Sequence, residues 1–251
     1  GSLTINSGNG TTTGVFQATS GTTTITKDVG GIFRHADTAT FTHNDGLVQF
    51  TGDDGTLDME SGHSGRKTPT NPLKFYDLKS AVTLNYLNIY VDFTVENTWT
   101  ITNDSTYGVS VRQPAYITMG TTTSAGTITG PTTGSDCIYF AGAATESKVL
   151  AANTDGLYPW VYTGNDWGWS SGDGNVINIE NGDYRTALVT DTTFHGGSSG
   201  NDITIKLTGD MEFDAVTVSA GDTLDVDGQR IYTSGDVDVN GNLKMGAGLW
   251  V

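Results

Sequence analysis

The chain of 251 residues lacks several features that would define common classes of protein. Its one cysteine, Cys137, excludes a disulfide within the chain, so stability has to come from packing and backbone pairing. Only 12 side chains are basic against 28 acidic ones, a formal charge of −16. Phosphate recognition needs clustered Lys and Arg, so no nucleic acid is expected as the main partner. No apolar run approaches the roughly 18 residues that a membrane span requires, so no membrane insertion is expected.

The sequence also has few signatures of chemistry. It contains no Gly-x-Ser-x-Gly elbow and no phosphate-binding Gly-Lys-Ser/Thr loop. Its four histidines are far apart, without the short paired spacing of a zinc site, and they are His35, His43, His63 and His195. The sequence therefore predicts a protein that is not an enzyme, with no catalytic residue, no cofactor and no metal site.

Acidic groupings offer the main alternative to that prediction. The segment 236–241 matches the first half of a calcium loop, but the twelfth position, which needs a bidentate Glu, is Ala247. We therefore interpret this segment as a strand followed by a turn, with Val237 and Val239 in the core. Two other groups could supply a hard-cation site or the carboxylate pair of a glycosidase, and acid pairs are also expected by chance in so acidic a chain. They are Asp53, Asp54, Asp58 and Glu60, and Asp173, Glu180 and Asp183.

Short alternating strands are the main feature that is present. Thr, Gly, Asn, Asp and Ser dominate the composition, with 34 glycines in all, which favours many short strands separated by turns. In the N-terminal part, apolar residues alternate with Thr, which places Thr on the outer face of each predicted strand. These strands are predicted at 3–6, 22–26, 38–42, 47–50 and 56–59.

The C-terminal stretch 205–245 carries the clearest pattern. Valine, leucine and isoleucine alternate in bursts of three to five residues, and turn dipeptides separate the bursts. These dipeptides are Ala220-Gly221, Asp227-Gly228, Ser234-Gly235 and Asn240-Gly241. Three strands and three corners make a unit of about 20 residues, the size of one turn of a β-solenoid. We predict stacked short strands here, with Val226 and Val239 in the core.

Several segments divide the chain. A fainter copy of the pattern at 75–103 suggests two related blocks about 140 residues apart, although any strand-turn sequence of Thr, Val, Asp and Gly resembles another. The expected organisation is a Thr-rich β block at 1–60, an exposed loop or junction at 61–72, a solenoid-like β block at 73–130, an aromatic-containing β insertion or further solenoid rungs at 131–204 and a β-solenoid block at 205–251. Residues 141–153 are compatible with one short helix or with a strand-to-strand excursion.

An aromatic segment at 157–169 is the candidate binding site. Aromatic side chains at alternate positions fall on one face of a strand and can stack on sugar rings, with Asn165 and Asp166 nearby to hydrogen bond. The alternative, which the interspersed Leu157 and Val161 favour, is that the rings close a core or a subunit interface. The candidate glycan-binding residues are Tyr158, Trp160, Tyr162, Trp167 and Trp169.

The run from Phe213 to Met245, with its cycle of turn, Val-x-Val and turn, resembles the repetitive β-helical structural proteins of tailed bacteriophages, particularly marine ones. The resemblance covers mainly the last 50 residues and is shared with bacterial surface adhesins. It implies an all-β right-handed β-helix or β-solenoid, with a β-sandwich or jelly roll as the alternative. It also implies a virion-surface fibre, spike or appendage that takes part in host attachment as a homotrimer, beside other virion proteins and a host surface glycan. A cell-surface adhesin or filament subunit and a polysaccharide-degrading β-helix enzyme are the alternative functions.

Overall fold

The computed structural model of the chain consists of β-strands and turns, with no helix among the residues that it describes. These are residues 3–5, 14–26, 33–35, 37–53, 55–59, 67–83, 86–102, 108–130, 138–141, 148–152, 161–163, 167–170, 176–179, 186–188, 192–196, 204–207, 210–213, 216–218, 220–233, 235–247 and 249–250. Within these ranges, no helix is long and apolar enough to cross a membrane.

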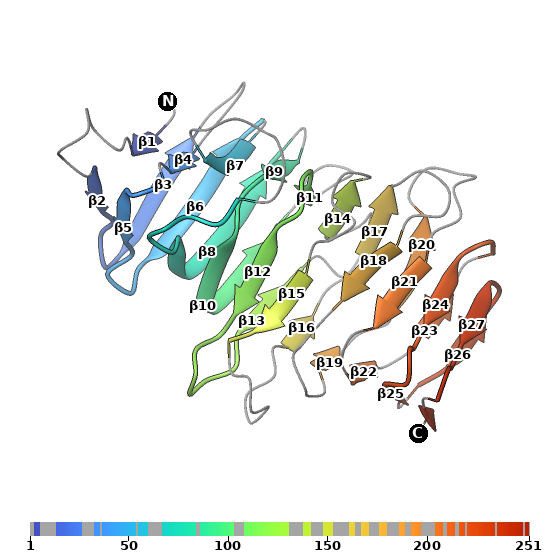
Figure 1. The fold of residues 1–251 in the computed structure, drawn as a ribbon. Coiled ribbons are helices and arrows are strands. Elements are labelled where there is room, and N and C mark those ends of the chain that lie inside the picture. The colour runs from blue at the N-terminus through green and yellow to red at the C-terminus, as the bar shows by residue number, and fades with distance from the viewer. Residues whose placement is uncertain are drawn as a thin grey trace.

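Strands far apart in the sequence lie side by side in two large sheets (Figure 1). The ten-stranded sheet contains, in spatial order, β1 (Leu3–Ile5), β4 (Phe33–His35), β7 (Gly55–Met59), β9 (Leu87–Ile89), β11 (Val109–Val111), β14 (Ile138–Ala141), β17 (Trp167–Ser170), β20 (Thr192–Gly196), β23 (Val216–Val218) and β26 (Val237–Val239). The twelve-stranded sheet runs through β28 (Leu249–Trp250), β25 (Arg230–Thr233), β22 (Met211–Phe213), β19 (Thr186–Leu188), β16 (Val161–Thr163), β13 (Thr127–Thr129), β10 (Phe93–Ile101), β8 (Lys74–Val82), β6 (Leu47–Gly52) and β3 (Thr22–Thr26). Off this path, β12 (Tyr116–Met119) pairs with β10 and with β15 (Lys148–Ala151).

Two smaller sheets complete the fold. One contains β18 (Val176–Ile179), β21 (Thr204–Leu207), β24 (Thr223–Asp225) and β27 (Asn242–Lys244), and the other pairs β2 (Val15–Gln17) with β5 (Thr40–Thr42). Every pair of these strands is parallel, as the register of each shows. A β-sandwich or jelly roll is built from antiparallel pairs, so that alternative is wrong for the strands of this structure.

The chain visits different sheets in turn before it returns to the first. After β23 in the ten-stranded sheet come β24 in the four-stranded sheet and β25 in the twelve-stranded one, and β26 then pairs with β23. We call three such consecutive strands a triplet, and the last triplet is β26 to β28. Strands β8 and β10 are each nine residues long, and the register between them shifts between Val95 and Thr98. Strand β10 pairs with β12 through residues 93–95 and with β13 through residues 98–100, so it supplies two positions of a triplet.

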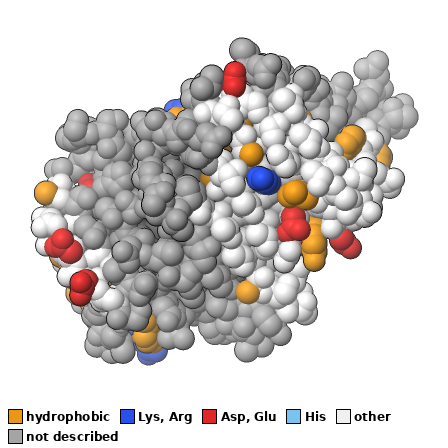
Figure 2. Space-filling model, turned by 180° about the vertical axis from the view of Figure 1, so that it is seen from behind, with side chains coloured by type: hydrophobic (Ala, Val, Ile, Leu, Met, Phe, Trp, Pro, Cys, Tyr) orange, Lys and Arg blue, Asp and Glu red, His pale blue; other side chains and the backbone are white. Residues whose placement is uncertain are grey.

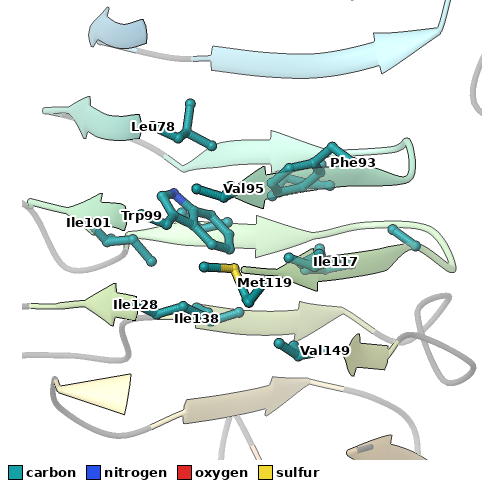
Figure 3. Packing of buried hydrophobic residues seen from close by; sticks show 14 of the residues in the cluster. Leu78, Phe93, Val95, Trp99, Ile101, Ile117, Met119, Ile128, Ile138 and Val149 are labelled. Atoms are coloured by element: carbon teal, nitrogen blue, oxygen red, sulfur yellow. The ribbon is translucent and has the colours of Figure 1, made fainter. Parts of the chain in front are cut away.

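The core lies between the sheets, where residues in register stack in columns (Figure 3). Leu78, Trp99 and Ile128 form one such column, and all three side chains are fully buried. The indole Nε1 of Trp99 donates a hydrogen bond to Ser80 Oγ at 3.1 Å, which satisfies a polar group that burial would otherwise leave unpaired. Toward the N-terminus the core is aromatic, and edge-to-face pairs join Phe33 to Phe50 and Phe75 with ring centroids about 6 Å apart.

The Thr-rich strands follow the predicted alternation. In β3, Ile25 is buried while Thr24 and Thr26 are exposed. Thr26 Oγ1 lies 2.6 Å from Thr51 Oγ1 on β6, so outward threonines of neighbouring strands form a side-chain ladder. Period-two alternation thus predicted both the strands and their outer faces.

The C-terminal prediction is confirmed in its strands and wrong in two core residues, Val237 and Val239. Strands β21 to β27 occupy the predicted stretch, and turns or bends lie at the predicted dipeptides 220–221, 227–228 and 240–241, with left-handed φ at Gly221 and Gly228. Ser234, in the fourth predicted dipeptide, lies outside the described residues. Val226 is fully buried, but Val237 and Val239 are 41% and 37% exposed. Strand β26 is the edge strand of its sheet, so no further strand covers these two valines.

Three further predictions concern the organisation of the chain. The expected loop at 61–72 is described from residue 67 onward, where it contains no strand. Thr68, Thr70 and Pro72 are exposed there, whereas Lys67 and Pro69 are buried. In the two related blocks, the sequence pattern matches Phe75 with Phe213 and Trp99 with Val237. Phe75 and Phe213 both lie in the twelve-stranded sheet, but Trp99 lies in that sheet and Val237 in the ten-stranded one, so the blocks do not correspond at every strand. The region that was compatible with a helix contains strand β15.

Candidate functional site

An open groove of about 210 Å³ lies where the segment 67–73 crosses strands β10 and β12. It is the candidate functional site because it combines polar and apolar side chains in a hollow on the surface. Its lining residues are Thr68, Pro69, Pro72, Leu73, Asp92, Phe93, Thr94, Tyr116 and Thr118.

The segment 67–73 is held on both of its sides by hydrogen bonds. On one side, Thr70 donates through its backbone N and its hydroxyl to Asp37 Oδ1, at 2.8 and 2.9 Å. On the other side, the backbone N–H groups of Asp92 and Thr94 donate to the carbonyl oxygens of Lys67 and Leu73, at 2.8 and 2.9 Å. Two prolines prevent a continuous strand here because they lack the N–H group. The wall of the groove is therefore an irregular segment fixed at both edges.

Asp92 is the polar centre of the groove. Its side chain belongs to a residue that is only 8% exposed, and both carboxylate oxygens accept hydrogen bonds. Thr68 Oγ1 donates to Oδ2 at 2.5 Å, and the backbone N–H of Tyr116 donates to Oδ1 at 2.8 Å. Hydrogen bonds to a charged group each contribute about 1.5 to 3 kcal/mol, so Asp92 ties the segment to strand β12.

The floor of the groove presents hydroxyl groups. Strands β10 and β12 pair in parallel with Thr94 opposite Thr118, and the flanking residues Phe93 and Val95 are buried. Because side chains alternate along a strand, Thr94 and Thr118 share the outward face with Tyr116. A row of hydroxyl groups on the sheet thus faces the apolar proline segment.

A charged cluster lies nearby, on the outer side of β8 and β10. His43 Nε2 is 3.3 Å from Glu96 Oε2, and Lys74 Nζ is 3.2 Å from Glu96 Oε1. The backbone N–H of Asp45 donates to His43 Nδ1 at 3.0 Å, while Nε2 faces Glu96. The His43 ring stacks on Tyr76 with centroids 6.0 Å apart. This arrangement fastens a turn to the sheet, and no lining residue of the groove takes part in it.

No family model, no curated protein and no solved structure matches the chain. Its function is therefore inferred from the chemistry of its own residues.

The candidate glycan-binding aromatic residues lie partly in strands. Tyr162 is in β16, in register with Ile128, and Trp167 is in β17, in register with Ile138, while Trp169 follows in the same strand. Ile128 and Ile138 are fully buried. Tyr158 and Trp160 lie outside the described residues. The choice between a glycan-binding face and a buried core or subunit interface stays a prediction for these residues.

The candidate acidic residues are not brought together in the described parts of the chain. Asp53 accepts a hydrogen bond from Thr83 Oγ1 at 3.0 Å, and Asp58 lies in β7 opposite Arg34. The remaining acidic residues of both groups, Asp54, Glu60, Asp173, Glu180 and Asp183, lie outside the described residues, as do His63 and Cys137. Across the described ranges no three His, Cys, Asp or Glu side chains form a metal-binding group.

Sequence reasoning missed the groove. Its residues come from three stretches around positions 70, 93 and 117, and no local motif joins them. A signal was present in the segment itself, because Pro69 and Pro72 mark an irregular segment between two predicted strand blocks. Only the parallel pairing of β10 with β12 places Tyr116 and Thr118 beside it.

Proposed function

We propose that the chain is a right-handed β-solenoid that serves as a rigid structural element of a virion surface, as a fibre, spike or appendage that contributes to host attachment. The observation that carries this proposal is the return of the chain to a parallel partner after each triplet. Val216 and Val237, for example, are register partners 21 residues apart on neighbouring strands. A parallel pair needs a crossover, and here the crossover consists of strands in other sheets rather than a helix.

The dimensions of the stack suit a rigid shaft. The ten strands from β1 to β26 lie side by side in one sheet, with the first and last triplets at opposite ends (Figure 1). Parallel strands are spaced about 4.8 Å apart, so ten of them span about 43 Å. Each triplet contacts its neighbours along the stack, which makes the structure stiff along that axis.

The chemistry of the surface supports a role outside nucleic-acid binding. Figure 2 shows that the described part of one face consists mostly of uncharged polar side chains and backbone, with few and scattered Lys and Arg side chains. A formal charge of −16 keeps closely spaced copies soluble through mutual repulsion. The groove beside β10 and β12 is the place where such a shaft would contact a receptor.

The proposal includes a homo-oligomer, with a trimer as the expected state. Val15 is 63% exposed near one end of the stack, and Val237 and Val239 are exposed at the other. Exposed apolar edge strands favour association because their backbone groups and side chains are left uncovered. Light scattering at micromolar concentration is expected to give three times the mass of one chain, and a stable monomer would contradict this part of the proposal.

Immunogold electron microscopy tests the location and the role. Antibodies against the chain are applied to a culture that carries its gene, with cells and released particles examined separately. Label on tails, spikes or capsids supports the proposal, whereas label on cell envelopes favours a surface adhesin or filament subunit. Label confined to the cytoplasm contradicts both. In parallel, loss of chain length in host polysaccharide after incubation with the protein would show an enzyme instead.

A further inference from the structure

We propose that the groove between the segment 67–73 and strands β10 and β12 binds a single uncharged sugar ring of a surface glycan. This inference rests on the proposed attachment function and names the class of ligand. It concerns a different place from the aromatic segment around Trp167, since none of the aromatic residues singled out there lines the groove.

The charges around the groove exclude strongly ionic ligands. None of its nine lining residues is Lys or Arg, so a sulfate, phosphate or sugar acid would find no cationic partner among them. Asp92 is the one acidic side chain of the lining, and both of its oxygens already accept hydrogen bonds. It is also largely buried, so it does not offer an exposed counter-charge to a cation. An uncharged ligand therefore suits a lining that has no cationic side chain and no exposed carboxylate.

The hydroxyl groups of the floor are available to such a ligand. Thr94 and Thr118 are half-buried, and their hydroxyls have no hydrogen-bond partner among the described residues. The Thr68 hydroxyl donates to Asp92, which orients its lone pairs as acceptors. A sugar ring carries several hydroxyls that both donate and accept, and it complements this set of donors and acceptors.

The other side of the groove is apolar. Exposed Pro72 and the half-buried ring of Tyr116 line it, above the buried side chains of Pro69 and Leu73. A sugar ring has an apolar C–H face beside its hydroxyl edge, so it can place the face on these side chains and the edge on the threonines. A proline-rich peptide needs a groove lined by several exposed aromatic rings, and the second ring here, Phe93, is only 3% exposed.

The size of the groove limits how much of a glycan can enter it, and its rigidity lowers the cost of binding. Its volume of about 210 Å³ lies below the 300 to 1,000 Å³ typical of sites for drug-sized ligands, so one ring fits and the rest of a glycan extends outside. The segment 67–73 is pinned on both edges, through Asp37 on one side and Asp92 and Thr94 on the other. The site is therefore formed before the ligand arrives, which reduces the ordering cost of binding.

Ligand titration followed by NMR tests the inference with the methyl glycosides of glucose, galactose, mannose and N-acetylglucosamine. At least one is expected to bind with a Kd on the order of 1 mM, as a small neutral ligand should. Thr118→Val and Thr94→Val should each weaken that binding by about fivefold, because each removes one hydrogen bond. Thr129→Val is the matched control, since Thr129 lies half-buried on β13 away from the groove, and it should leave the Kd unchanged. Thr118→Ser keeps the hydroxyl and should retain binding, which separates the loss of a contact from a folding defect.

The inference is overturned if none of the four glycosides binds, or if both valine variants bind like the parent protein. It is also overturned if glucuronic acid, glucosamine or a proline-rich peptide occupies the groove more tightly than the neutral glycosides. These outcomes are independent of the microscopy. Gold label on particles without sugar binding leaves the proposed function in place and removes the glycan inference. Sugar binding together with cytoplasmic label supports the sugar site in the groove and removes the proposed virion function.

Discussion

Two valine pairs near the C-terminus share one pattern but differ in burial. Val216 and Val218 on β23 lie in register with Val237 and Val239 on β26, the next strand of the same sheet. The first pair is fully buried, whereas the second is 41% and 37% exposed. Both pairs stand in a Val-x-Val strand between turns, so their local sequence is nearly the same.

The difference comes from the number of neighbours rather than from the residues themselves. Strand β23 has β20 on one side and β26 on the other, but β26 has only β23. In a stack of triplets, each inward side chain is covered by the triplets above and below it. The last triplet therefore has the same sequence pattern as the core triplets, but its valines are not buried. Variants at matched positions in β23 and β26 can separate the effect of the sequence pattern from the effect of burial.

The largest difference is expected between Val218→Asp and Val239→Asp. The first places an unpaired carboxylate in a fully buried site, which costs on the order of 4 to 5 kcal/mol or prevents folding. The second places it at a partly exposed edge, where about 1 kcal/mol or less is expected. Chemical denaturation of both variants checks this. Equal losses would mean that β26 is covered in solution, by another chain or another part of this one.

A second test concerns the middle of the stack, where Trp99 is fully buried and bonded to Ser80. Trp99→Phe should reduce the free energy of unfolding by about 2 to 3 kcal/mol, because it leaves a small cavity and an unpaired hydroxyl. Thermal and denaturant unfolding measure this loss. Ser80→Ala alone should cost less, and it should reduce the further cost of Trp99→Phe in the double variant. Additive losses would show that the hydrogen bond contributes nothing.

The corners provide a third comparison. A Cβ added at Gly46 would lie 2.1 Å from the carbonyl oxygen of Thr19 and 2.6 Å from that of Gly21, because a neighbouring corner packs directly against it. Gly46→Ala should therefore cost about 2 to 3 kcal/mol. At Gly228, with φ of +85°, an added Cβ meets no atom within 4 Å, so Gly228→Ala should cost only about 1 kcal/mol from backbone strain. Differential scanning calorimetry would show which variant loses more stability. A larger loss for Gly228→Ala than for Gly46→Ala would mean that backbone strain at a positive φ costs more than the steric clash at Gly46.

The smallest effect is expected on the outer face. Thr26→Val removes the contact between the hydroxyls of Thr26 and Thr51, which are 2.6 Å apart on an exposed surface. Cross-strand side-chain pairs contribute about 0.2 to 1 kcal/mol, so a loss of about 0.5 kcal/mol is expected from urea unfolding. Thr24→Val, on the same strand and face, serves as the control. Equal effects of the two variants would show that the threonine ladder does not stabilise the sheet.

Strands and turns were largely predictable because they depend on neighbouring residues. The alternation of Thr with Ile25 indicates a strand with one buried face, and the structure has that strand. Asp227 and Gly228 indicate a tight turn, and both have positive φ. The prediction of core residues held for Val226 but not for Val239, because the same residue type can lie inside the stack or at its end.

The candidate site was less predictable. The sequence drew attention to Trp167 and Trp169, whose clustering is visible within one short segment. The groove instead joins Pro69, Asp92 and Tyr116, which are separated by more than twenty residues at each step. Its composition is ordinary, and only the pairing of distant strands makes it a site.

The sequence by itself determined an acidic all-β chain, with strands and turns set by local alternation and by residues that tolerate positive φ. The tertiary structure decided which strands pair, and that choice placed Val218 inside and Val239 at an edge. It also brought the segment 67–73 against β10 and β12. The physical reason is that backbone conformation depends on adjacent residues, whereas burial and a binding surface depend on neighbours that only folding supplies.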